Sequence, residues 1–210
     1  MYTIRTEVMV VPGKTRAFEA WWAQLSGLAK AQHGFQAGTL LNSLSYPAKY
    51  VFLMRWENRE ARQAWTKGEA FNAFLQANPP QALVTPGRPQ EAYDVLFRVT
   101  GEGQPAYASL IDWTLDPRPG NAASFERTRQ DLFELRKQYG PGFVANALGR
   151  LFGHQYRYQV VQFYSTMEAL RAAGPGSQIP QLQAFGGAHP PGEYASTPLS
   201  AEVYEVVRSV

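Results

Sequence analysis

The sequence predicts an α+β protein in which two copies of a βαββαβ unit, the ferredoxin-like arrangement, follow one another along 210 residues. One observation is an internal repeat. Pro12-Gly13 recurs as Pro119-Gly120, 107 residues later, and Gly34-Phe35 recurs as Gly142-Phe143, 108 residues later. A second observation is that strand and helix periodicities alternate in the same order in both halves. A repeat this long indicates two whole small domains rather than a solenoid.

The first copy begins with a strand, because apolar and polar residues alternate over residues 2–11 until Pro12-Gly13. A helix follows, since Phe18, Trp21, Trp22 and Leu25 recur at the spacing of one helix face. In chain order we expect a strand (2–11), a helix (14–30), strands (35–44 and 49–56), one helix capped by Asn58 and stopped by Pro79-Pro80, and a strand (92–99).

The second copy repeats this order up to its third strand and then diverges. Gly174-Pro175-Gly176 shortens its second helix, and residues 184–200 are rich in Gly, Pro and Ala, which predicts an irregular loop. We expect strands over 107–115, 143–152, 155–164 and 203–207, with a helix over 122–138. Gly101, Gly103 and Pro105 indicate a linker, so the predicted domains are 1–100 and 106–210.

A four-stranded sheet that is covered by helices on one side has a second face that needs a partner. We therefore expect the two sheets to pack face to face within the chain, as an intrachain pseudo-dimeric α+β barrel. The protein would then be a monomer with an internal pseudo-dimer, or a weak homo-oligomer. Asp112 stands 107 residues after Arg5, at the equivalent position of the repeat, which predicts paired polar groups between the sheets.

Composition excludes several classes of protein. Hydrophobic residues make up 45% and charged residues 18%, as in ordinary globular proteins. The net charge of +3 comes from scattered Lys and Arg, so no nucleic-acid partner is expected. The chain has no Cys, which fits a reducing cytoplasm, and no apolar run approaches the ~20 residues of a membrane span. His33, His154 and His189 lack metal-ligand spacing, so no metal site is expected.

The segment Trp56–Ala61, at the end of the third strand, resembles the antibiotic-biosynthesis monooxygenase (ABM) family of dimeric α+β barrels, in a tandem two-domain form. The Pro-Gly after the first strand and the Gly-Phe before the second belong to the same resemblance. The first half matches along nearly its whole length. The second half matches more loosely, with Tyr164–Ala169 in place of the Trp-Glu pattern. This fold hosts cofactor-free oxygenases, haem-degrading enzymes, isomerases and binding proteins, so the reaction is left open.

The family's catalytic residues carry over only in part. The resemblance implies an Asn, a Trp and a His for haem degradation, and this chain has Thr6, Trp65 and Leu75 at those positions. In the polyketide-oxidising branch an Asn precedes the strand-three Trp by four residues, and here Phe52 precedes Trp56. For both Trp56 and Trp65, core packing is favoured over a functional role. No catalytic residue is assigned.

Side chains of the first half that should face the helices, with one arginine at the rim, form the candidate ligand pocket. They are Thr6, Trp22, Tyr50, Phe52, Met54, Trp56, Arg62 and Trp65. This apolar set suits a small aromatic or polycyclic molecule. The leading hypothesis is binding of such a molecule, with cofactor-independent monooxygenation as the candidate reaction. The alternatives are a non-catalytic ligand-binding or stress-associated protein and, ranked last, a haem-degrading enzyme.

Overall fold

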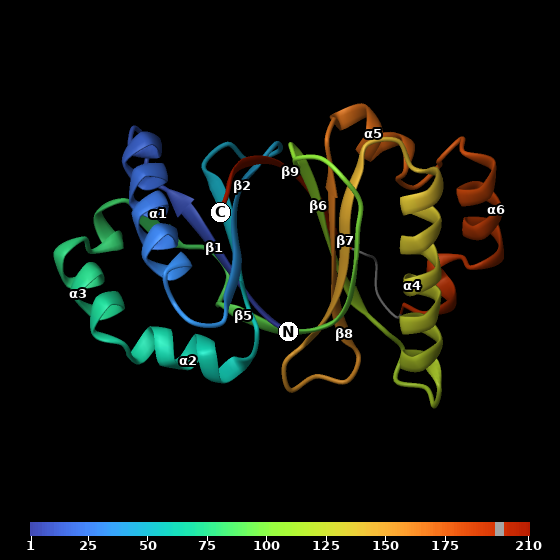
Figure 1. The fold of residues 1–210 in the computed structure, drawn as a ribbon. Coiled ribbons are helices and arrows are strands. Elements are labelled where there is room, and N and C mark those ends of the chain that lie inside the picture. The colour runs from blue at the N-terminus through green and yellow to red at the C-terminus, as the bar shows by residue number, and fades with distance from the viewer. Residues whose placement is uncertain (196–199) are drawn as a thin grey trace. The chain divides into compact units, whose positions relative to one another are not determined.

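The computed structural model describes residues 1–195 and 200–210, which divide into two compact units (Figure 1). The N-terminal unit comprises Met1–Tyr93 and Val206–Val210, and the C-terminal unit comprises Asp94–Glu205. Strands and helices follow the βαββαβ order in both halves. The predicted α+β fold class, with its doubled ferredoxin-like repeat, is confirmed.

In the N-terminal unit β3 lies between β1 and β2, and both neighbours run antiparallel to it. Trp56 at the end of β3 is therefore opposite Tyr2 on one side and Phe35 on the other. The elements are β1 (Tyr2–Val10), α1 (Thr15–Lys30), β2 (Phe35–Ser43), β3 (Lys49–Trp56), α2 (Arg59–Lys67), α3 (Glu69–Ala77), a 3₁₀ turn (Pro80–Ala82), β4 (Val84–Pro86) and the start of β5 (Glu91–Thr100). Figure 1 shows the three helices on one side of these strands.

The single helix expected between Asn58 and Pro79 is wrong, because the structure has two. Asn58 caps the first, and its side-chain oxygen accepts a hydrogen bond from the Ala61 amide at 2.8 Å. Gly68 then adopts an extended conformation (φ −71°, ψ 151°), which ends α2 and begins α3. A glycine lowers the stability of a helix interior enough for tertiary packing to break the helix there.

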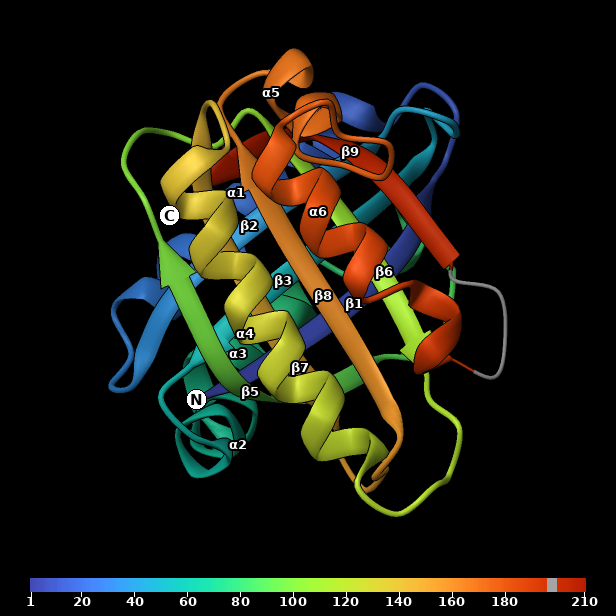
Figure 2. The same ribbon diagram turned by 90° about the vertical axis from the view of Figure 1, so that its right-hand side faces the viewer.

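In the C-terminal unit β8 occupies the centre of the sheet, between β6 and β7, and β9 pairs with β6. The elements are β6 (Tyr107–Thr114), α4 (Asn121–Tyr139), β7 (Phe143–Leu151), β8 (Arg157–Tyr164), α5 (Met167–Ala172), α6 (Pro180–Ala188), a 3₁₀ turn (Pro191–Glu193) and β9 (Ser200–Ser209). Figure 2 shows α4 and α6 side by side over this sheet.

The second helix of this unit is cut short as expected, since α5 has only 6 residues and ends before Gly174. The irregular loop expected over 184–200 is partly wrong, because α6 runs to Ala188 and a 3₁₀ turn covers Pro191–Glu193. Pro180 stands in the first turn of α6, where a missing N–H costs nothing. Residues 196–199 lie outside the described chain.

The last strand of each sequence repeat contributes to both units. Most of β5, from Asp94 onward, belongs to the C-terminal unit, where the amide of Gly101 donates to the carbonyl of Val144 at 2.8 Å. Residues 206–210 belong to the N-terminal unit, where Gly38 and Val210 exchange backbone hydrogen bonds of 3.1 and 2.9 Å. The ranges 1–100 and 106–210 stay a prediction about the sequence repeats.

The charged residues on β1 and β6 have partners inside their own units. A guanidinium nitrogen of Arg5 lies 3.5 Å from a carboxylate oxygen of Glu7 and another lies 3.7 Å from Glu91. Asp112 accepts a hydrogen bond from Gln159 at 3.0 Å. The expected pairing of polar groups between the two sheets stays a prediction. Within the described ranges, none of the helices combines the length and apolar character that crossing a bilayer requires.

Candidate ligand-binding site

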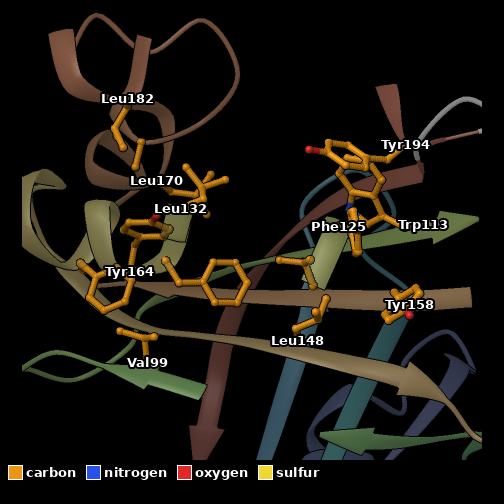
Figure 3. Packing of buried hydrophobic residues seen from close by; sticks show 14 of the residues in the cluster. Val99, Trp113, Phe125, Leu132, Leu148, Tyr158, Tyr164, Leu170, Leu182 and Tyr194 are labelled. Atoms are coloured by element: carbon orange, nitrogen blue, oxygen red, sulfur yellow. The ribbon is translucent and has the colours of Figure 1, made fainter. Parts of the chain in front are cut away.

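A cavity of about 420 Å³ lies in the C-terminal unit, between helices α4 and α6 and the helix-facing side of β6 and β8. We call it the C-terminal cavity. Its floor is formed by Ile111, Trp113, Val160 and Gln162, and α4 forms one wall. Figure 3 shows how the surrounding core packs, with Trp113, Phe125 and Tyr194 at one end and Leu132 and Leu182 at the other. This volume is within the range of small-molecule sites.

The cavity exists because the second helix of this repeat stops early. Ala173 and the Gly174-Pro175-Gly176 segment line it where the N-terminal unit has a longer helix. The repeat equivalent of Ala173 is Trp65, whose ring lies 6.4 Å from that of Trp56 and 5.1 Å from that of Phe71. In the N-terminal unit the Trp65 indole fills this space, whereas in the C-terminal unit the Ala173 methyl group leaves it open.

Several residues of the cavity are repeat equivalents of the site residues predicted in the first half. The pairs are Thr6 and Trp113, Trp22 and Arg129, Phe52 and Val160, Met54 and Gln162, and Trp65 and Ala173. The cavity therefore lies in the C-terminal repeat at the place equivalent to the pocket predicted in the N-terminal repeat. The expected place of the ligand was the first half, and that placement stays a prediction.

The predicted residues of the first half do come together, as a packed core. Six of them are buried in one cluster: Trp22, Tyr50, Phe52, Met54, Trp56 and Trp65. The other two are joined through Gln90, which donates to the hydroxyl of Thr6 at 2.8 Å and accepts from Arg62 at 3.1 Å. Burial lowers the pKa of Arg62. Tyr50 donates to a carboxylate oxygen of Glu19 at 2.9 Å.

Two arginines of α4, Arg129 and Arg136, line the C-terminal cavity although they are buried, with exposed fractions of only 8% and 7%. The guanidinium carbon of Arg129 lies 4.8 Å from the ring centre of Trp113 and 5.1 Å from that of Phe125. Within residues 1–195 and 200–210, neither arginine forms an ion pair, and Nε of each lacks a hydrogen-bond partner. Burial, and secondarily the positive charge of Arg136, lowers the pKa of Arg129 to about 10. Burial also lowers the pKa of Arg136.

More polar groups without partners lie close to Arg136. Asn146 on β7 is opposite Gln162 on β8, and neither its side-chain oxygen nor its nitrogen has a hydrogen-bond partner among the described residues. The Tyr164 hydroxyl also lacks a partner of normal hydrogen-bond geometry there, although the Asn146 amide lies close enough to lower its pKa. Burial raises the pKa of Tyr164 more than the charge of Arg136 and the Asn146 amide lower it, so the phenol is neutral and can donate.

Arg129 and Arg136 were missing from the sequence prediction, although a signal for them exists. They continue the buried stripe of α4 with Phe125, Leu132 and Phe133, and their repeat equivalents are Trp22 and Ala29. A charge on the buried face of a helix is unusual enough to indicate a site.

The histidines contribute little to this site. His189 is half-exposed at the rim of the cavity, with its ring 4.7 Å from that of Phe185. His33 and His154 are not part of the cavity wall. In the part of the chain that the structure describes, no three His, Asp or Glu side chains gather as metal ligands. The cavity therefore offers apolar contact and positive charge to a ligand.

Known proteins resemble the chain in fold and, over its first part, in sequence. The family model described as antibiotic biosynthesis monooxygenase matches residues 1–77, and a search of curated proteins found no match. A monooxygenase candidate from Fusobacterium nucleatum subsp. nucleatum superposes with a TM-score of 0.78 at 10% identity, covering 99% of this chain and 93% of that one. Another, from Lactobacillus acidophilus, gives 0.73 at 9% identity, covering 100% and 94%.

An anthrone oxidase-like protein gives a TM-score of 0.63 at 15% identity, covering 100% of this chain and 92% of its own. At such identities these structures show the fold alone, and they show it over the whole chain. The resemblance stated from the sequence is confirmed, because the antibiotic biosynthesis monooxygenase (ABM) family model matches residues 1–77 of this chain.

Proposed function

We propose that the protein binds a small aromatic or polycyclic molecule in the C-terminal cavity and oxidises it with molecular oxygen, using no metal or flavin. One observation carries this proposal: the guanidinium of Arg129 is buried against Trp113 in an aromatic and aliphatic cavity and has no acid partner in the described chain. A positive charge in a water-poor site lowers the pKa of a phenol or enol beside it.

The substrate anion matters because triplet oxygen reacts slowly with closed-shell molecules, whereas an electron-rich anion can give it one electron. If the reacting group is a CH₂ between aromatic rings, its conversion to C=O supplies four electrons. One oxygen atom enters the product, and the other leaves as water with the two hydrogens, so no external reductant is needed. The anthrone oxidase-like protein of the same fold supports this substrate class.

Binding without catalysis is the second candidate function. Among the described residues that line the cavity there is no Asp or Glu, and His189 at the rim is the only imidazole there that could act as a general base. A protein that only holds its ligand needs no such base. Under both candidate functions, we propose that the protein is cytoplasmic and monomeric.

Oxygen uptake tests the choice between these functions. With a panel of anthrones, quinols and polyphenols, we expect wild-type protein to consume oxygen with one compound class. Ligand binding, followed by quenching of tryptophan fluorescence, without any oxygen uptake would favour the non-catalytic protein.

Two substitutions at equivalent positions locate the site. Ala173→Trp should fill the C-terminal cavity and abolish binding and uptake, whereas Trp65→Ala should leave both intact. Unchanged binding in Ala173→Trp, together with lost binding in a Trp65→Ala protein that circular dichroism shows to be folded, would place the ligand among the residues predicted in the first half.

A further inference from the structure

One part of the C-terminal cavity is polar, although it is buried as deeply as the apolar part. It consists of Arg136 and Gln162 on the cavity wall, with Asn146 opposite Gln162 and Tyr164 close to Arg136. Asn146 and Tyr164 are fully buried, and Arg136 is 7% exposed. We call these four residues the polar end of the cavity.

The polar end has more hydrogen-bonding groups than partners. Among the described residues, Nε and one Nη of Arg136 lack a hydrogen-bond partner, and the Asn146 amide and the Tyr164 hydroxyl have at most a weak bond to each other. Leaving a buried charge and several dipoles unpaired destabilises a folded protein, and native proteins pair nearly all such groups. The missing partner should be an acceptor of hydrogen bonds, because the guanidinium and the neutral phenol are donors.

The other repeat shows that the fold does not require these polar groups. At the equivalent positions the N-terminal unit has Ala29, Gly38, Met54 and Trp56, all without a polar side-chain group except the indole N–H. The same strands and the same helix form around both sets. The polar end therefore serves a need of the C-terminal cavity alone.

We propose that the ligand of the C-terminal cavity is an aromatic carboxylic acid, and that its carboxylate binds Arg136 at the polar end while its ring system lies against Trp113 and Arg129. This inference rests on the proposed function for the aromatic part of the ligand. Arg and carboxylate form paired, charge-assisted hydrogen bonds, which are stronger than bonds between neutral groups. A carboxylate would also offset the mutual repulsion of Arg129 and Arg136, which is a secondary cause of the lowered pKa of Arg129.

A matched pair of probes tests the acid group separately from the ring. Anthraquinone-2-carboxylate and anthraquinone-2-carboxamide share one ring system and differ in charge, and their binding can be followed by titration calorimetry. We expect wild-type protein to bind the acid at least about tenfold more tightly than the amide, the factor expected for charged hydrogen bonds.

Variants assign this preference to residues. Arg136→Met should bring the affinity for the acid down to that for the amide and leave the amide unchanged. Arg127→Met removes an exposed charge from the same helix and should alter neither affinity. Gln162→Met introduces the residue of the other repeat, and it should weaken acid binding even if Arg136→Met does not fold.

The outcomes separate the two levels of the proposal. Equal affinity of wild-type protein for acid and amide would overturn the carboxylate site and leave the aromatic site standing. An acid preference that survives both Arg136→Met and Gln162→Met would also overturn the carboxylate site. Failure of both probes to bind would reject the aromatic site, and the carboxylate site with it.

Discussion

Replacing Arg129 with Met should make the ligand-free protein more stable. The substitution exchanges a buried guanidinium for an apolar chain of similar length, at a position where the other repeat has Trp22. Arginine on a buried helix face ordinarily has an acid partner, and Arg129 has none within the described residues. Removing an unpaired buried charge is one of the few core changes that stabilise a protein.

The size of the effect follows from two opposing contributions. A pKa lowered to about 10 corresponds to roughly 3 kcal/mol of unfavourable free energy for the charged side chain at neutral pH. The ring contacts to Trp113 and Phe125 offset about 1–2 kcal/mol of it. The net expectation is a gain of about 1–2 kcal/mol in the free energy of unfolding, or several degrees in Tm for a chain of this size.

Urea unfolding of the ligand-free protein measures this gain. Arg127→Met is the control, because that exposed charge lies on the same helix and should change stability by less than about 0.5 kcal/mol. The same Arg129→Met protein should bind the ligand more weakly, so stability and binding change in opposite directions. A loss of more than about 1 kcal/mol in Arg129→Met would refute the reasoning, because it would mean that the guanidinium has a structural partner.

Four further outcomes test other parts of the structure. Trp65→Ala should cost about 3–5 kcal/mol of stability in calorimetry, because the indole is buried among aromatic rings and leaves a large void. Asn58→Ala removes the cap of α2 and should cost about 1 kcal/mol in urea unfolding. Gly142→Ala should cost about 1–3 kcal/mol by the same assay, since φ is +59° there and a Cβ would stand 2.5 Å from the Ser165 hydroxyl. A titration with haem should show no histidine-ligated Soret band, because Leu75 stands where the resemblance implies the iron ligand, and steady haem loss under ascorbate would contradict this.

The sequence predicted those features that depend on local chemistry. Asn58 was expected as a helix cap because its side chain can accept a backbone hydrogen bond, and it does so. The early end of the second helix in the later repeat followed from Gly174 and Pro175. The break at Gly68 was missed, because an isolated glycine is compatible with a continuous helix and only packing decides against it.

The cavity could not be predicted in the same way, because it depends on what neighbouring elements leave unfilled. Arg129 and Arg136 have the helical spacing of core residues but the charge of surface residues, and sequence alone does not show which property prevails. A comparison of the two repeats, position by position, would have indicated both arginines. It would also have indicated Ala173, which replaces the Trp65 that closes the other copy.

Because β9 contributes to both units, it affects how the protein folds during synthesis. The N-terminal unit includes residues 206–210. Val210 exchanges backbone hydrogen bonds with Gly38 of β2, so this segment lies along the edge of β2. During synthesis, this unit can assemble β1, β3 and its helices early, but β2 keeps an open edge until residues 206–210 have been translated. Open edges invite pairing with other chains. Deletion of residues 206–210 should therefore impair folding of the first unit, far away along the sequence, and the shortened chain should aggregate.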